Sequence, residues 1–373
     1  MSAALRTARL SRLRTAMQAQ GIDLLMLAGN AWRTDYLRYA LDVTPVEGAA
    51  IALIGQQGPL RLYVEHPIEA ARLRHEAPWL EVLHPAGYYG QIEQALAAHA
   101  TQRLAAAPAS ALPWRLAQSL TRDSIVNTTA LLDQLMVEKL AAEADQVTAA
   151  AILADGGYEV FAGAARIGRC EFELVADTEA WLRSEGCPEN FMIMGSGGVE
   201  VRGMHPPGAR RIALGDLVTT ELTPCIDGYY AQICRTLVIG EPSKTQRDAY
   251  AVYLEALEAG IAVVRPGATH ADVARAQNDV FRRYGLGDYV GPEYTRVRGH
   301  GMGLYVDGPH VLEDVNLVLK PGMTLIVHPN TYHPAVGYIV LGDTVRVTET
   351  GCAVLTQTPR ALRAVPANAK ESS

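Results

Sequence analysis

The spacing of apolar residues in the first third of the chain alternates between two periods, which predicts strands and helices in turn. Short apolar runs bounded by polar residues are typical of buried strands, whereas apolar residues every three or four positions predict a helix with one buried face. The predicted helices are 9–20 and 92–105, and the predicted strands are 23–28, 49–53 and 60–64. Because strands and helices alternate, we expect residues 1–132 to form a small α/β domain.

After residue 132 the helical runs become longer and an antiparallel pair is added. An Asp-Gly pair at 227–228 lies between the apolar runs 217–223 and 229–239, which predicts a β-hairpin. The expected helices are 137–154, 171–185, 245–264 and 270–283, and a further strand begins at residue 191. We expect residues 133–365 to form a second domain of helices and antiparallel strands, followed by a frayed polar tail at 366–373.

The composition limits the class of protein. With 373 residues, of which 49% are hydrophobic and 20% charged, the chain is long enough for two packed domains. Its net charge of −7 includes no basic block, so we expect no nucleic-acid partner. No apolar run reaches the roughly 18–20 residues that cross a bilayer, and the N-terminal segment lacks the apolar core of a signal peptide. We therefore expect no membrane association.

The cysteines are five in number, scattered, and without a Cys-x-x-Cys pair. This pattern argues against a disulfide framework or a zinc knuckle and favours a reducing compartment. The sequence therefore predicts a cytoplasmic protein.

Residues 299–304, Gly-His-Gly-Met-Gly-Leu, resemble the glycine-rich signature of the pita-bread family. This family comprises aminopeptidase P, prolidase, methionine aminopeptidase and creatinase, and the resemblance covers about residues 5–357. The N-terminal pattern is similar to the N-terminal domain of the creatinase and aminopeptidase P branch. The resemblance implies an α/β N-terminal domain, an α+β pita-bread C-terminal domain, and a homodimer in which the N-terminal domain reaches the partner's pocket.

In the metallopeptidase members of the family, the signature histidine joins two aspartates and two glutamates to hold two divalent metals. Here His300 is unchanged, but Glu221 and Gln232 stand where the motifs have aspartates, and His328 and Gly342 stand where they have glutamates. A pair of hard cations needs several bridging carboxylates to offset its charge. The resemblance therefore implies no two-metal centre in this chain, and we expect no cofactor.

A second interpretation of the same residues stays open. His300, His328 and Glu221 form a two-histidine, one-carboxylate set that a single zinc or iron(II) ion can use. The simpler interpretation is a pair of hydrogen-bonding histidines in a polar pocket.

The predicted hairpin gathers polar side chains on one face. Side chains alternate along a strand, so Tyr230, Gln232 and Cys234 share a face, and the turn near 226–227 brings that face onto the face of Glu221. We expect Glu221 to lie opposite Gln232, with both residues facing one pocket.

The segment around His205 resembles the family's "Pro-His" segment, whose histidine is the general acid and base in creatinase. The resemblance makes His205 the leading proton-transfer candidate, because an imidazole titrates near neutral pH. His300 and His328 would stabilise a substrate oxyanion. Glu221 would anchor a cationic group, act as a base, or attack as a nucleophile.

Tyr230 and Gln232 of the hairpin face, together with five further residues, are candidates for substrate contacts. Cys234 stands where creatinase carries a glutamate that binds guanidinium, and it is either a small buried residue or a nucleophile that needs a neighbouring base. Asp307 and His310 stand where the family has "His-Glu-x-Pro", so the second peptidase histidine is lost from its position. Trp32 and Arg33 lie in a segment that contacts the partner's substrate in creatinase, although an ordinary surface loop is an open alternative.

These observations predict a metal-independent hydrolase that cleaves a C–N bond, other than an Xaa-Pro peptide bond, in a small amino-acid-like, amidine or amide metabolite. The alternatives are a lyase, cyclase or isomerase on such a metabolite, a non-catalytic binding module, and a divergent metallopeptidase. In each enzymatic case the expected partner is a small-molecule substrate.

Overall fold

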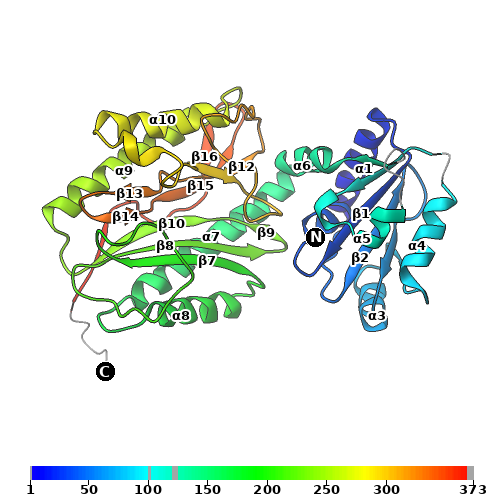
Figure 1. Cartoon of the computed structure of the whole chain (residues 1–373), viewed down its shortest axis with the longest axis horizontal. Helices are drawn as coiled ribbons and strands as arrows, with labels where there is room; N and C mark the ends of the chain where they lie inside the picture. The colour runs from blue at the N-terminus through cyan, green and yellow to red at the C-terminus, as the bar shows by residue number, and fades with distance from the viewer. Residues whose placement is uncertain (1, 100–101, 120–124, 368–373) are drawn as a thin grey trace. The chain divides into compact units, whose positions relative to one another are not determined.

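The computed structural model describes residues 2–99, 102–119 and 125–367 (Figure 1). The chain divides into two compact units, Met1–Met136 and Val137–Ser373. The expected boundary after residue 132 falls inside helix α6 (Thr129–Val137), so the division comes a few residues later. Of the expected frayed tail, residues 368–373 lie outside the described part.

The first unit is built on a six-stranded mixed sheet with the order β4-β3-β2-β1-β5-β6. The central strand β1 (Leu24–Asn30) pairs antiparallel with β2 (Ala49–Gly55) and parallel with β5 (Leu104–Ala107). The other strands are β3 (Arg61–Val64), β4 (Glu81–Leu83) and β6 (Ile125–Asn127). The helices before α6 are α1 (Ala3–Ala19), α2 (Asp35–Leu41), α3 (Pro67–Glu76), α4 (Tyr88–Ala97) and α5 (Trp114–Ser119), with a short 3-10 turn η1 (Ala109–Ala111). This is the expected α/β arrangement.

One predicted element of this unit is wrong in its second half. The helix expected over 92–105 ends with α4 at Ala97, and Leu104–Ala107 form strand β5 instead. All four residues of β5 are buried between β1 and β6. An alanine-rich run favours helix locally, but pairing in the middle of a sheet outweighs that weak preference.

The second unit contains a nine-stranded sheet whose main path is β11-β12-β15-β10-β8-β7 (Figure 1). Its strands are β7 (Asn190–Gly197), β8 (Leu217–Ile226), β9 (Tyr229–Tyr230), β10 (Ile233–Ile239), β11 (Gly299–Gly301), β12 (Thr324–Val327), β15 (Gly342–Val347), β16 (Cys352–Val354) and β17 (Arg363–Val365). A separate two-stranded sheet pairs β13 (Thr331–His333) with β14 (Gly337–Ile339). The helices are α7 (Ala141–Ala164), α8 (Glu171–Ser184), α9 (Lys244–Val263) and α10 (His270–Arg283), with a 3-10 turn η2 (Gly287–Val290).

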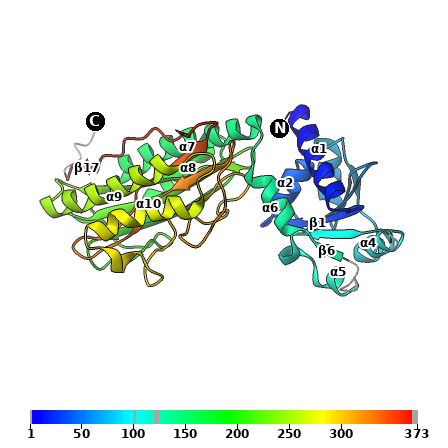
Figure 2. The same cartoon turned by 90° about the horizontal axis from the view of Figure 1, so that it is seen from above.

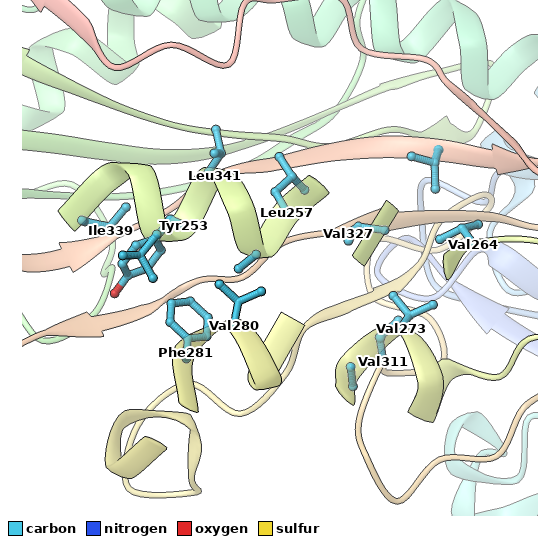
Figure 3. Close-up of a cluster of buried hydrophobic side chains, with 14 of the residues drawn as sticks. Tyr253, Leu257, Val264, Val273, Val280, Phe281, Val311, Val327, Ile339 and Leu341 are labelled. Atoms are coloured by element: carbon cyan, nitrogen blue, oxygen red, sulfur yellow. The ribbon is translucent and has the colours of Figure 1, made fainter. Parts of the chain in front are cut away.

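The helices of this unit form two pairs, α7 with α8 and α9 with α10 (Figure 2). Side chains of α9 and α10, such as Tyr253 and Phe281, pack with Val327 and Leu341 in one apolar cluster (Figure 3). Side chains of α7 and α8 pack with Leu222 of β8 in another cluster. Because side chains alternate along β8, the neighbour of Leu222, Glu221, points to the opposite face of the sheet.

Among the described residues, no helix combines the length and the apolar character that crossing a membrane requires.

Candidate functional site

The hairpin of β8, β9 and β10 sets the register of the site. Asp227 and Gly228 both have positive φ, 49° and 85°, as a two-residue hairpin turn requires. The predicted turn is therefore confirmed, but the predicted partner of Glu221 is wrong. The register places Cys234 opposite Glu221, and Gln232 lies two residues earlier on the same strand face.

The neighbouring strands add further residues to the face of the sheet that carries Glu221, Gln232 and Cys234. Cys234 pairs with Gly342 on β15, and His328 directly follows β12, the next strand. His300 lies on β11, beyond β12. The ring centroids of His300 and His328 are 5.6 Å apart. We call Glu221, His300 and His328, which the structure gathers on one face of the sheet, the candidate site.

The carboxyl group of Glu221 is the acidic group of this site. Its Oε1 accepts a hydrogen bond of 2.7 Å from Nδ2 of Asn330. Burial raises the pKa of Glu221 from 4.5 to about 7, while hydrogen bonds from Asn330 and Cys234 act in the opposite direction and the charge of Asp307 adds to the rise. A carboxyl group whose charge changes near neutral pH can both accept and return a proton.

The two histidines are held in the neutral state. Burial lowers the pKa of His328 well below its usual value, and the neighbouring His300 and Arg298 lower it further. Burial also lowers the pKa of His300, against the opposing charge of Asp307. Within the part of the chain that the structure describes, Nδ1 of His328 has no hydrogen-bond partner. A buried polar atom is normally paired, so this nitrogen is available to a bound molecule.

Cys234 and Gln232 are bonded to each other. Nε2 of Gln232 donates to Sγ of Cys234 at 3.3 Å, and both side chains are buried. Burial raises the pKa of Cys234 well above its usual value, and the charge of Glu221 raises it further. The thiol form is therefore stabilised, which favours the small buried residue over the nucleophile.

Asp307 and His310 lie beside His300. Nε2 of His310 donates to Oδ1 of Asp307 at 3.1 Å, and that oxygen lies 3.7 Å from Nδ1 of His300. The backbones of His300 and His310 form an antiparallel bridge. These two predicted residues are therefore brought to the candidate site, and both are exposed to solvent.

Apolar and aromatic side chains line the same region. The predicted Tyr230 is one of them, and its hydroxyl donates to Glu189 at 2.5 Å. The buried members of this cluster are Cys225, Tyr230, Cys234, Met302, Ile326, Tyr332, Tyr338 and Val340.

The structure does not bring His205 to the candidate site, and this prediction is corrected. Its Nδ1 lies 3.9 Å from Oε2 of Glu171, at the start of α8. The preceding residue, Met204, is the one that packs against the cluster around Tyr230. Neighbouring side chains of an extended segment point to opposite sides, so His205 points away from that cluster.

Trp32 and Arg33 belong to the first unit, in a turn after β1. Oδ1 of Asn30 accepts hydrogen bonds from the backbone N–H groups of both residues. Trp32 is 95% exposed, and Arg33 pairs with Asp35 at 3.0 Å. Their contact with a partner's substrate, and the homodimer itself, stay predictions.

Asn330 is the residue of the site that sequence reasoning missed. It lies two residues after His328 in a Pro-Asn-Thr segment, where asparagine is also an ordinary turn residue. Only the fold shows that its side chain reaches Glu221 from the segment between β12 and β13.

The donors present do not fit the two-metal centre that the resemblance describes for metallopeptidases. Across the described ranges, no three His, Cys, Asp or Glu side chains are placed to hold a metal ion. The amide of Gln232 is bonded to Cys234, and Glu221 is bonded to Asn330. Gly342 offers no side-chain donor.

Gly342 is required sterically. A Cβ atom at this position would lie 2.7 Å from Cβ of His328 and 2.9 Å from the carbonyl oxygen of Val327. We expect Gly342→Ala to lower the free energy of unfolding by about 1–3 kcal/mol, measured by urea denaturation, because the backbone of β12 must shift. Gly351→Ala is the control, since nothing lies within 4 Å of a Cβ atom there. Equal stability of the two variants would contradict this steric explanation.

Comparisons with known proteins agree with this architecture. Residues 145–349 match Metallopeptidase family M24, and residues 9–152 match the Creatinase/Prolidase N-terminal domain. The chain is 33% identical over 201 residues to the Xaa-Pro dipeptidase of Pyrococcus furiosus, a match that covers 52% of this chain and 56% of that protein. The chain thus spans about half the length of this curated relative.

Two solved structures extend the likeness to nearly the whole chain. The dipeptidase PepE from Mycobacterium ulcerans superposes with a TM-score of 0.83 and 27% identity, covering 98% of this chain and 99% of that one. The Xaa-Pro dipeptidase from Bacillus anthracis superposes with a TM-score of 0.82 and 25% identity, covering 96% and 100%. The expected two-domain fold, with a creatinase-type N-terminal domain and a pita-bread C-terminal domain, is therefore confirmed.

The same comparisons contradict the function expected from the sequence. The relatives are named as Xaa-Pro dipeptidases and dipeptidases, and the matching family is one of metallopeptidases. Metal-independent chemistry on a C–N bond other than an Xaa-Pro peptide bond, and its non-hydrolytic and non-catalytic alternatives, are not supported. Substitutions at the motif positions therefore do not by themselves exclude peptide hydrolysis in a domain that matches this family over its length. With more than half of its length matching, this chain belongs to Metallopeptidase family M24.

Proposed function

We propose that this chain hydrolyses short peptides of about dipeptide size, with Xaa-Pro dipeptides as the first candidates. The observation that carries the proposal is the gathering of Glu221, His300 and His328 on one face of the pita-bread sheet. The names of the similar proteins, Xaa-Pro dipeptidase and dipeptidase, support this substrate class.

The residues of the site have chemical properties that suit hydrolysis. Glu221, with a pKa of about 7, accepts a proton from water or returns one to the leaving amine. His300 and His328 are neutral and donate N–H groups to the carbonyl oxygen as negative charge develops on it.

The surroundings of the site favour a substrate with an apolar part. Tyr332, Tyr338, Met302 and Val340 are buried in one cluster with Cys234. Such a lining, with a few polar groups, is typical of small-molecule sites, and it suits the ring of proline or an aliphatic side chain.

The test is an assay of the purified full-length protein with a panel of dipeptides, both Xaa-Pro and proline-free. Each reaction is run with a chelator and with Mn²⁺, Co²⁺ or Zn²⁺ added separately, and free amino acids are measured by mass spectrometry. We expect cleavage of at least one Xaa-Pro dipeptide. A folded protein that cleaves no dipeptide under any of these conditions would exclude the proposed function.

The same assay distinguishes the contributions of His300 and His205 to catalysis. His300→Ala is expected to lower kcat/KM for the cleaved dipeptide by ~10²–10⁴-fold, because it removes a polar group of the site. His205→Ala is expected to change kcat/KM little, because His205 faces Glu171 instead. Circular dichroism confirms that both variants are folded. The reverse ranking would restore His205 as the proton-transfer residue.

A further inference from the structure

We infer that Asn330 is a positioning residue, which fixes the carboxyl group of Glu221 by occupying one of its two oxygens. The inference rests on the proposed function in giving Glu221 a role in catalysis. It deepens that function, because it explains how the carboxyl group of Glu221 is held in one position in the site.

Asn330 is itself held rigidly. Its side chain is fully buried, and its backbone oxygen accepts a hydrogen bond of 3.0 Å from Nη1 of Arg298. Its Oδ1 accepts a hydrogen bond of 3.0 Å from the backbone N–H of Leu341. A backbone N–H can only donate, so this contact fixes which end of the amide is oxygen.

The other end of the amide is therefore an NH₂ group, and it faces the candidate site. Nδ2 donates to Oε1 of Glu221 at 2.7 Å and lies 3.7 Å from Sγ of Cys234. Cys234, the register partner of Glu221 on β10, also makes a side-chain hydrogen bond to the carboxyl group.

An NH₂ donor suits both charge states of Glu221. It can donate to an oxygen of the carboxylate, and equally to the carbonyl oxygen of the neutral acid. Because Oε1 accepts this bond in both states, the proton, when present, resides on Oε2. Glu221 is half-buried, and Oε2 is the oxygen that the bond to Asn330 leaves for a proton from water or substrate.

The test exchanges the two polar groups. Asn330→Asp places a second carboxyl group against Glu221, and we expect it to lower the midpoint of urea denaturation at pH 8. In the double variant Asn330→Asp/Glu221→Gln the same bond forms with donor and acceptor reversed, so the midpoint is expected to lie above the value obtained by adding the effects of the two single substitutions. Dipeptide hydrolysis is expected to stay as low as in Glu221→Gln, because the carboxyl group is now at position 330 instead of 221.

Asn330→Ala, with a matched control, separates positioning from ordinary packing. It is expected to lower kcat by up to ~10²-fold with a smaller change in KM, because a misplaced catalytic group affects the chemical step most. Asn190→Ala is the control, since Asn190 also accepts from a backbone N–H, of Thr223, and donates to a glutamate, Glu179. That control is expected to lose stability but keep its kcat.

Two results would overturn the inference. One is a kcat for Asn330→Ala equal to that of the wild type. The other is additivity of the Asn330→Asp and Glu221→Gln effects on the denaturation midpoint, which would show that the two side chains do not interact. The second measurement needs no substrate, so it judges the contact even if the wild type cleaves no dipeptide and the proposed function fails.

Discussion

At pH 8 the free energy of unfolding of the Glu221→Gln variant is expected to be up to about 3 kcal/mol higher than that of the wild type. The same variant is expected to lose hydrolytic activity. Burial raises the pKa of Glu221 from 4.5 to about 7, so the folded state binds the proton more tightly than the unfolded state. The stability that this group contributes is complete below pH 4.5 and is lost as the pH rises through 7. The shift of about 2.5 units corresponds to about 3 kcal/mol.

Glutamine does not titrate, and its oxygen can still accept the hydrogen bond from Asn330. The difference in the free energy of unfolding between the variant and the wild type is therefore expected to be small at pH 5 and to reach its full size above pH 7. Urea denaturation at several pH values measures it. Glu349→Gln, at an exposed turn, is the control for exchanging a carboxyl group for an amide. A difference that does not change with pH would refute the raised pKa.

Asp343→Ala is expected to lower the free energy of unfolding by about 3–5 kcal/mol. Asp343 accepts hydrogen bonds from Arg235 at 2.7 Å, from Arg360 at 2.5 Å and from Thr356 at 2.9 Å. Both Arg235 and Asp343 are only 1% exposed. Removing the carboxylate leaves the guanidinium group of Arg235 buried without its ion-pair partner, and an uncompensated buried charge is strongly destabilising.

The control for this prediction is an exposed ion pair in the same unit. Asp314 contacts Arg296 at 3.1 Å, and its side chain is 69% exposed. Asp314→Ala is expected to change the free energy of unfolding by less than about 1 kcal/mol, because solvent screens the interaction. Similar losses in both variants, measured by urea denaturation at one pH, would count against the buried ion pair at Asp343.

The order of elements and the hairpin could be predicted because both depend on local patterns. The Asp-Gly pair at 227–228 requires positive φ, and apolar runs flank it, so the turn followed directly from the sequence. Which residue lies opposite Glu221 depends on the register between β8 and β10. A register shift of two residues changes the opposing residue but leaves the same side chains on the same face of the sheet. Alternation therefore placed Glu221, Gln232 and Cys234 on one face, but it could not choose which of the last two lies opposite Glu221.

Local sequence patterns could not predict how some other residues are placed in the site. His205 and Met204 are neighbours, and a shift of one residue in an extended segment decides which of them meets the site. Asn330 contacts Glu221 across 109 positions of sequence, and only the folded sheet brings the two together. The expected function was wrong because it rested on the substitutions at Glu221, Gln232, His328 and Gly342, whereas the domain as a whole matches a family of metallopeptidases.

Gly342 also constrains the order in which this site can change during evolution. Every residue other than glycine at position 328 carries a Cβ atom, and a Cβ atom at 342 would lie 2.7 Å from it. Replacing His328 by another side chain therefore does not make room at 342, and the carbonyl oxygen of Val327 would still lie 2.9 Å away. A side chain at 342 is therefore expected to lower stability unless other substitutions first move the backbone at the end of β12. The main chain thus makes a single substitution at 342 costly, whichever residue occupies position 328.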